Sequence, residues 1–141
     1  MLLGARFMNN VASVNAFDWA LQTEMTEGSG PVTVYFQLVD KSLDRDDQGF
    51  RNFATGRRYM PASGATLQVI LKNIADAATL TKVASQAFPT SDPSIWSFQI
   101  ASSDLVKGTV SMTLVLTEGS KVTKALVPAG ILVYSNSPGD C

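Results

Sequence analysis

The stretch that decides the fold is residues 94–134, SIWSFQIASSDLVKGTVSMTLVLTEGSKVTKALVPAGILVY. Hydrophobic residues occupy every second position after Gly108, namely Val110, Met112, Leu114 and Leu116. This period of two is typical of a β-strand with one buried face. Glu-Gly-Ser at 118–120 predicts a turn, because glycine tolerates a positive φ. Short strands separated by short turns predict an antiparallel β-sandwich.

Similar alternation predicts three strands before this stretch, at residues 17–25, 32–39 and 65–74. A glycine-rich turn separates the first two, so we expect them to pair as a hairpin. Pro128 to Gly130 is expected to interrupt the last strand before 131–134 completes the sheet. The predicted core consists of large residues at the inward positions: Trp19, Val34, Phe36, Leu67, Val69, Trp96, Phe98, Leu114 and Leu116.

The order of these motifs resembles a known family. It runs from Ser-x-Trp-x-Phe at 94–98, through Gly108 and the acidic turn, to Ile-x-Val-Tyr at 131–134. The pattern from Pro31 to Tyr134 is similar to the immunoglobulin-like domains of tailed-phage virion proteins, such as the N-terminal part of baseplate upper proteins. The resemblance implies an immunoglobulin-like β-sandwich that docks in a virus particle. It departs from antibody-type domains, because no cysteine pair exists to bridge two sheets.

Residues 76–87 fit two interpretations. Asp76 is a suitable cap for a short helix with one apolar face, made of Leu80, Val83, Ala84 and Ala87. The run from Leu80 to Phe88 also suits a strand. The family resemblance places a strand here, and the strand is therefore favoured.

The sequence divides into three parts around one domain of 17–134. Residues 1–16 are apolar and rich in amides, and form either an edge strand of the same domain or an arm on a neighbouring subunit. Residues 135–141 form a flexible polar tail that ends in the single cysteine, Cys141. Because Cys141 has no partner within the chain, we expect it to be dispensable for folding, whereas a disulfide between copies stays open.

Composition excludes several kinds of chemistry. The chain of 141 residues has no histidine, so Ser-His-Asp and Cys-His catalysis and histidine metal ligation are excluded. A single cysteine excludes a zinc cluster of thiolates. No P-loop and no spacing of paired carboxylates is present. We therefore expect a protein without catalytic activity, cofactor or metal.

Charge and hydropathy indicate which partners to expect. Eleven basic and twelve acidic residues give a net charge of -1, which draws the chain to neither nucleic acid nor anionic lipid. The longest apolar run, 125–134, is too short to span a membrane. Residues 1–16 lack the pattern of a signal peptide, so we expect synthesis in the host cytoplasm. A nearly neutral surface suits the packing of many copies.

The segment 40–61, DKSLDRDDQGFRNFATGRRYMP, differs from the rest of the chain. It combines charged and aromatic residues without a strand or helix period. Loops of about twenty residues in compact domains are often functional or ordered by a partner. Arginine and aromatic residues are enriched in interface cores. The segment is interpreted as either a solvated connection or a docking loop, in which the contact residues are Arg45, Phe50, Arg51, Phe53, Arg57, Arg58 and Tyr59.

Residues 44–49, DRDDQG, imitate the first half of a calcium loop. Gln48 stands where the loop requires Asp or Asn, and Thr55 stands where a bidentate Glu closes the site. A solvated acidic turn paired with local arginines is therefore favoured over a calcium site.

Two functional classes fit these observations. The first is a non-enzymatic virion structural protein of a tailed phage, located on the capsid surface, neck or tail, whose partners in a symmetric assembly are other virion proteins and copies of itself. The alternative is a carbohydrate- or receptor-binding module that uses Trp19 or Trp96. Both tryptophans fall at periodic strand positions, where a core role is expected.

Overall fold

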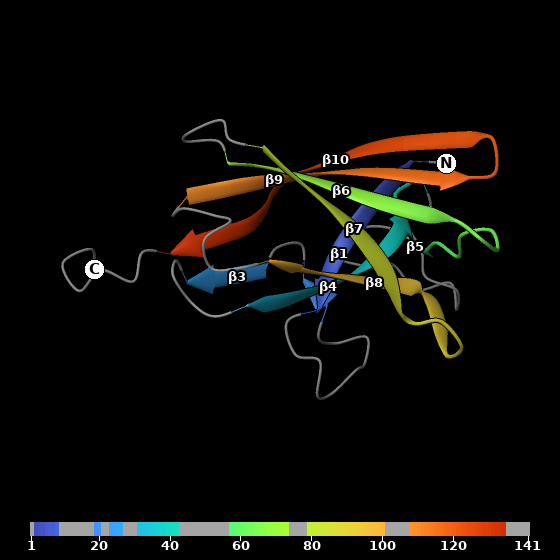
Figure 1. Ribbon diagram of the computed structural model, residues 1–141, viewed down its shortest axis with the longest axis horizontal. Coiled ribbons are helices and arrows are strands. Elements are labelled where there is room, and N and C mark those ends of the chain that lie inside the picture. Colours follow the sequence, from blue (N-terminus) through green and yellow to red (C-terminus); the bar gives the residue numbers. More distant parts are fainter. Residues whose placement is uncertain are drawn as a thin grey trace.

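The computed structural model describes residues 2–8, 19–20, 23–26, 31–42, 57–73, 79–100 and 108–134 (Figure 1). Within these ranges the regular elements are all β-strands, which confirms the expected all-β class for the described part of the chain. The strands are β1 (Leu3–Met8), β2 (Trp19–Ala20), β3 (Thr23–Thr26), β4 (Val32–Asp40), β5 (Arg57–Arg58), β6 (Thr66–Asn73), β7 (Thr79–Phe88), β8 (Asp92–Ile100), β9 (Gly108–Glu118) and β10 (Lys121–Tyr134). They lie in the order β2-β1-β4-β8-β7-β6-β9-β10-β3, and β5 pairs with β4.

Strand β7 joins two layers of this sheet (Figure 1). The first layer consists of β1, β4 and β8, and the second layer consists of β6, β9 and β10. The two layers face each other across a shared core. Residues 79–84 of β7 pair with β6, whereas Ser85, Gln86 and Phe88 pair with β8. The pairing with β8 shifts register between Gln86 and Phe88. Because β1 and β10 also meet, the sheet nearly closes on itself.

The core is built from alternating positions of the strands. In β6, Leu67, Val69 and Leu71 are buried, while Thr66, Gln68 and Lys72 between and beside them are exposed. The buried residues confirm the predicted core wherever the structure describes the side chain: Val34, Phe36, Leu67, Val69, Trp96, Phe98, Leu114 and Leu116. The backbone of Trp19 lies in β2, but its side chain lies outside the described residues.

Three phenylalanines span the first layer within this core. The ring of Phe36 on β4 lies 6.5 Å from that of Phe7 on β1 and 5.9 Å from that of Phe98 on β8. The second pair meets edge to face, an arrangement that adds attraction beyond the buried area. The aromatic contacts therefore tie β1, β4 and β8 together from the core side.

Two local predictions are confirmed. Glu118 pairs with Lys121 across a turn in which Gly119 has a φ of 62°, so glycine is required there. The ambiguous segment forms strand β7 over Thr79–Phe88, as the family resemblance favoured. Residues 74–78 lie outside the described residues.

The predicted hairpin of 17–25 with 32–39 is wrong. Residues 23–26 form β3, which pairs in parallel with residues 131–134 of β10. Strand β4 lies instead between β1 and β8. Periodicity identifies a strand but does not choose its neighbour, and β4 needs a neighbour on each edge because it is buried on both faces. The sheet is consequently mixed and not wholly antiparallel.

The expected interruption at Pro128 to Gly130 is confirmed in part: β10 continues through these residues, but its pairing with β9 is broken there. Val127 pairs with Met112 and Ile131 pairs with Val110, so β10 carries extra residues in a bulge. A Cβ on Gly130 would lie 3.1 Å from Cζ of Phe7. Glycine therefore permits the close approach of β1 and β10.

The ends of the predicted loop 40–61 belong to the sheet. Asp40 is the last residue of β4, and Arg57–Arg58 form β5, while 43–56 lie outside the described residues. In the N-terminal part, residues 3–8 form β1, and 9–16 lie outside the described residues, as do Cys141 and the rest of the tail.

We predict that Trp96→Ala destabilises the protein by about 3–5 kcal/mol, because the cavity in a packed core cannot collapse. Trp96 is 3% exposed, and within the described part of the chain its indole N–H has no acceptor. Trp96→Phe also removes this unsatisfied donor, so its cost should be only about 1 kcal/mol. Urea unfolding followed by circular dichroism measures both variants. Equal losses for the two would contradict this account.

Candidate functional site

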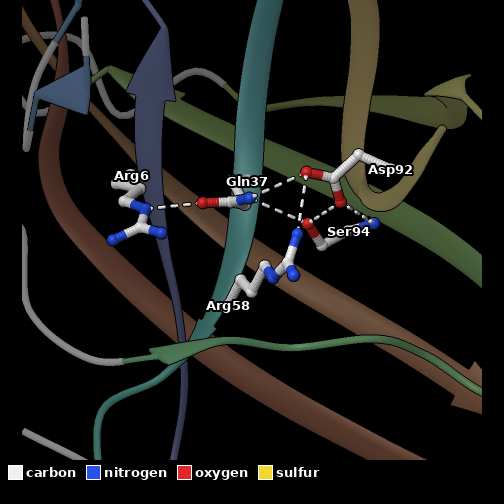
Figure 2. A network of polar contacts seen from close by, with 5 residues as sticks. All are labelled: Arg6, Gln37, Arg58, Asp92 and Ser94. Carbon is white, nitrogen blue, oxygen red and sulfur yellow. Dashed lines mark hydrogen bonds and ion pairs between the residues drawn. The ribbon is translucent and has the colours of Figure 1, made fainter. Parts of the chain in front are cut away.

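A chain of polar side chains crosses the first layer from β1 to β8 (Figure 2). Arg6 donates its Nε–H to Oε1 of Gln37 at 2.7 Å, and Nε2 of Gln37 donates to Oγ of Ser94 at 2.9 Å. Ser94 in turn donates its hydroxyl to Oδ1 of Asp92 at 2.5 Å. Arg6, Gln37 and Ser94 are all buried. Every bond runs in one direction, from a cation to an anion.

The carboxylate of Asp92 is the acceptor at the end of this chain. Its Oδ1 also accepts the main-chain N–H of Ser94 at 3.1 Å. Its Oδ2 lies 3.4 Å from Nε2 of Gln37 and 3.6 Å from Nη1 of Arg58 on β5. Since Arg58 is partly exposed, its ion pair with Asp92 contributes at most about 1 kcal/mol. The carboxylate is thus engaged on both oxygens.

This arrangement is chemically suited to holding strands together. A buried charge is costly unless it is paired and hydrogen-bonded. Gln37 and Ser94 each donate one hydrogen bond and accept another within this polar network. The bonds therefore polarise one another from Arg6 to Asp92. These hydrogen-bonded side chains link β1, β4, β5 and β8 to one another. They lie on the face of the layer opposite the core phenylalanines. The Ser94 hydroxyl lies beside the Asp92 carboxylate, but Ser94 is fully buried and its oxygen is also bonded to Gln37.

Tyr59 is fixed by a separate contact next to β5. Its main-chain N–H donates to the carbonyl of Leu38 at 2.8 Å, which extends the pairing of β5 with β4. Its hydroxyl lies 2.8 Å from both carboxylate oxygens of Glu118. The main-chain N–H of Ala62 donates to the same carboxylate at 2.9 Å. Burial of Tyr59, together with this bond to an acid, raises the pKa of its hydroxyl to about 12.

The turn after β4 uses an Asp-x-Ser motif that resembles the one at the start of β8. Oδ1 of Asp40 accepts the hydroxyl of Ser42 at 2.5 Å, and the main-chain N–H groups of Ser42 at 3.0 Å and Leu2 at 3.1 Å. Burial of Asp40 alone would raise the pKa of its carboxyl, but these bonds outweigh burial and lower it. In register, Asp40 lies opposite Arg57. Arg57 therefore lies opposite the aspartate of one Asp-x-Ser motif, and Arg58 pairs with the aspartate of the other.

The predicted contact residues are separated by this structure into two groups. Arg57 and Arg58 form β5, and Tyr59 follows them against the core. The other four, Arg45, Phe50, Arg51 and Phe53, lie outside the described residues, as does the calcium-like segment 44–49. The structure thus gives Arg58 and Tyr59 partners within the fold, and the docking role of the loop stays a prediction.

Sequence reasoning missed the polar chain, because its members come from four distant segments. Two signals were available. Arg6 is an isolated charge in an apolar strand, and the Asp-x-Ser motif occurs at 40–42 and again at 92–94. An aspartate two residues before a serine favours a local side-chain turn. Neither signal shows which strand lies next to which.

Hydrophobic side chains gather on the outer face of the second layer. Val83 of β7, Val122 and Leu126 of β10 are 73%, 55% and 60% exposed. Register places Val83, Gln68, Val115 and Lys124 in one row and Thr81, Ile70, Thr113 and Leu126 in the next. We call these eight residues and Val122 the exposed face. A surface on which several exposed hydrophobic side chains lie among polar ones can mark an interaction site.

Comparison of the chain with models of known protein families and with curated protein sequences finds no match. In the described ranges, no group of three or more acidic, cysteine or histidine residues is placed to hold a metal ion. The part of the chain that the structure describes also contains no helix of the length and hydropathy needed to cross a membrane.

We predict that Gln37→Leu destabilises the protein by about 2–4 kcal/mol, because Arg6 and Ser94 each lose a buried bond. Arg6→Met should be similarly costly. The double variant should be less destabilised than the sum of the two by about 1–3 kcal/mol. A double-mutant cycle from urea unfolding measures this coupling, and strictly additive losses would contradict the polar chain as a unit.

We predict that Tyr59→Phe costs about 1–2 kcal/mol at neutral pH, since a bond to a carboxylate is lost. The pKa of Tyr59 is about 12 in the folded protein against an ordinary 10.0, so the stabilisation is fully present below pH 10 and is lost as the pH rises through 12. The stability difference between the wild type and Tyr59→Phe should therefore shrink above about pH 10. Urea unfolding at several pH values tests this, with Glu118→Gln as a second variant. A difference that does not change with pH would argue against the bond.

Proposed function

We propose that this protein is a non-enzymatic structural subunit of a tailed-phage virion. Its immunoglobulin-like β-sandwich docks on the capsid surface, neck or tail, next to other virion proteins and copies of itself. The phage assignment and the immunoglobulin-like arrangement rest on the motif pattern from Pro31 to Tyr134. Two strand layers packed on one core are compatible with that arrangement.

The exposed face is the observation that carries a docking role. It carries aliphatic, threonine, glutamine and lysine side chains on four adjacent strands. Three of its aliphatic side chains are more than half exposed, although the chain has a core in which such residues are buried. Solvent exposure of several aliphatic side chains on one face is costly, and a partner that covers them removes that cost.

The state of the polar residues supports a structural role over a catalytic one. The described carboxylates of Asp40, Asp92 and Glu118 each accept main-chain as well as side-chain hydrogen bonds from their own fold. Arg58 pairs with Asp92. These groups are used to connect strands and turns, which is the role expected of polar residues in a scaffold.

The carbohydrate-binding alternative receives less support. Such a module presents exposed aromatic rings to its ligand. Trp96, one of the two tryptophans considered for this role, is buried among core residues. Tyr35 and Phe88 stack on each other at 6.5 Å and are only half-buried, in register with Ser97 and Asp92, so this stacked pair is an aromatic surface that stays open to the alternative.

We predict that the protein is present at a symmetric site in purified phage particles, where cryo-electron microscopy and mass spectrometry can locate it. Val83→Lys on the exposed face should lower incorporation at least about tenfold, because an interface must then desolvate a charge. Gln99→Lys provides a matched control, since it adds the same charge at an exposed strand position of the other layer. Absence of the wild-type protein from particles would refute the proposed function. Equal incorporation of both variants would show that the exposed face is not the docking surface.

A further inference from the structure

Among the strands that the structure describes, none pairs with one edge of β10 over its first half. Residues 121–127 pair with β9 on one side. On the other side, β3 pairs only with 131–134, and no other described strand pairs there. Figure 1 shows the β9–β10 hairpin at the upper right, with β10 along the upper border. An unpaired strand edge of this length presents a row of main-chain donors and acceptors to a partner.

The register shows which main-chain groups face this edge. Glu118 and Lys121 close a two-residue turn and so form a hydrogen-bonded pair. Such pairs recur at every second residue, which directs the main-chain groups of Thr123 and Ala125 toward β9. Those of Val122, Lys124 and Leu126 consequently point away from β9. The same three residues have exposed side chains.

Charge on this layer indicates the chemistry of the partner. Glu118 is the only acidic residue in β6, β7, β9 and β10, and its carboxylate is bonded to Tyr59 and Ala62. Lys124 stands between the apolar Val122 and Leu126 along the edge. A strand that matches these three positions needs an apolar, an acidic and an apolar residue at alternate positions.

A second copy of the same edge meets this requirement poorly. The two-fold pairing that uses all three outward residues places Val122 opposite Leu126, but Lys124 opposite Lys124 of the other copy. Like charges directly opposite in a sheet are destabilising. Lysine on an edge strand is also a common device against pairing between identical edges.

We propose that the edge of β10 at Val122, Lys124 and Leu126 binds an extended segment of a different protein, which adds an antiparallel strand with an apolar-x-acidic-x-apolar sequence. Main-chain bonds supply affinity in this mode, and alternate side chains supply specificity. The proposal rests on the docking role above and specifies the partner's chemistry.

The test uses the isolated protein and the synthetic peptide Ser-Thr-Val-Thr-Glu-Thr-Leu-Thr-Ser. Amide chemical shifts are recorded by NMR with peptide up to about 5 mM, a range that detects millimolar affinity. In the free protein, the amides of Val122, Lys124 and Leu126 should exchange fast, and those of Thr123 and Ala125 slowly. Peptide should shift and protect the three outward amides.

Variants separate the edge from a general attraction. Lys124→Pro removes one outward N–H and leaves pairing with β9 intact, so binding should fall below detection. Lys124→Thr keeps the N–H and should weaken binding about two- to fivefold. Lys72→Thr, the matched control on β6, should leave binding unchanged. Circular dichroism checks that each variant is folded.

Three results would overturn the proposal. They are slow exchange of the outward amides in the free protein, no peptide-induced shifts in the folded wild type, and equal binding by wild type and Lys124→Pro. Self-association through β10 in place of peptide binding would also overturn it. Any of these results combined with normal incorporation into particles would leave the proposed function standing, whereas absence from particles would remove that function independently.

Discussion

The rest of the structure depends on the burial of β4 on both faces. Phe36 and Leu38 on one face are fully buried in the core, while Gln37 and Val39 on the other face are also shielded from water. A strand in this position has no solvent to satisfy its main chain, so both edges must be paired. Strand β1 takes one edge, and β8 followed by β5 takes the other. Arg57 and Arg58 of β5 are thereby held in the sheet.

Burial of β4 also explains why a charged residue lies inside an apolar strand. Arg6 sits beside Gln37 in the register of β1 and β4, where it cannot reach bulk water easily. The polar chain to Asp92 compensates for its desolvation, and in doing so it selects one alignment of the strands. A shift by one residue would turn Arg6 toward the core phenylalanines. The polar chain thus adds specificity of register, which hydrophobic packing alone does not supply.

The sequence predicts local structure better than it predicts neighbours. Alternation identifies β6, β8 and β9, and Gly119 identifies the turn before β10, because these features depend on residues close in the chain. The parallel pairing of β3 depends on residues more than a hundred positions away, which no local pattern encodes. The polar chain is hidden for the same reason. Tyr59 looked like a free contact residue because its acceptor, Glu118, comes from a distant hairpin.

The parallel pairing of β3 with the end of β10 has a consequence for synthesis. A ribosome releases the chain from its N-terminus at about 5–20 residues per second, so β3 must wait at least about 5 s for its partner. During that interval β9 also lacks β10, and Phe7 lacks the surface that Gly130 provides. The sheet therefore cannot be completed progressively from β1, because the pairing of β3 has to wait until residues 131–134 have emerged.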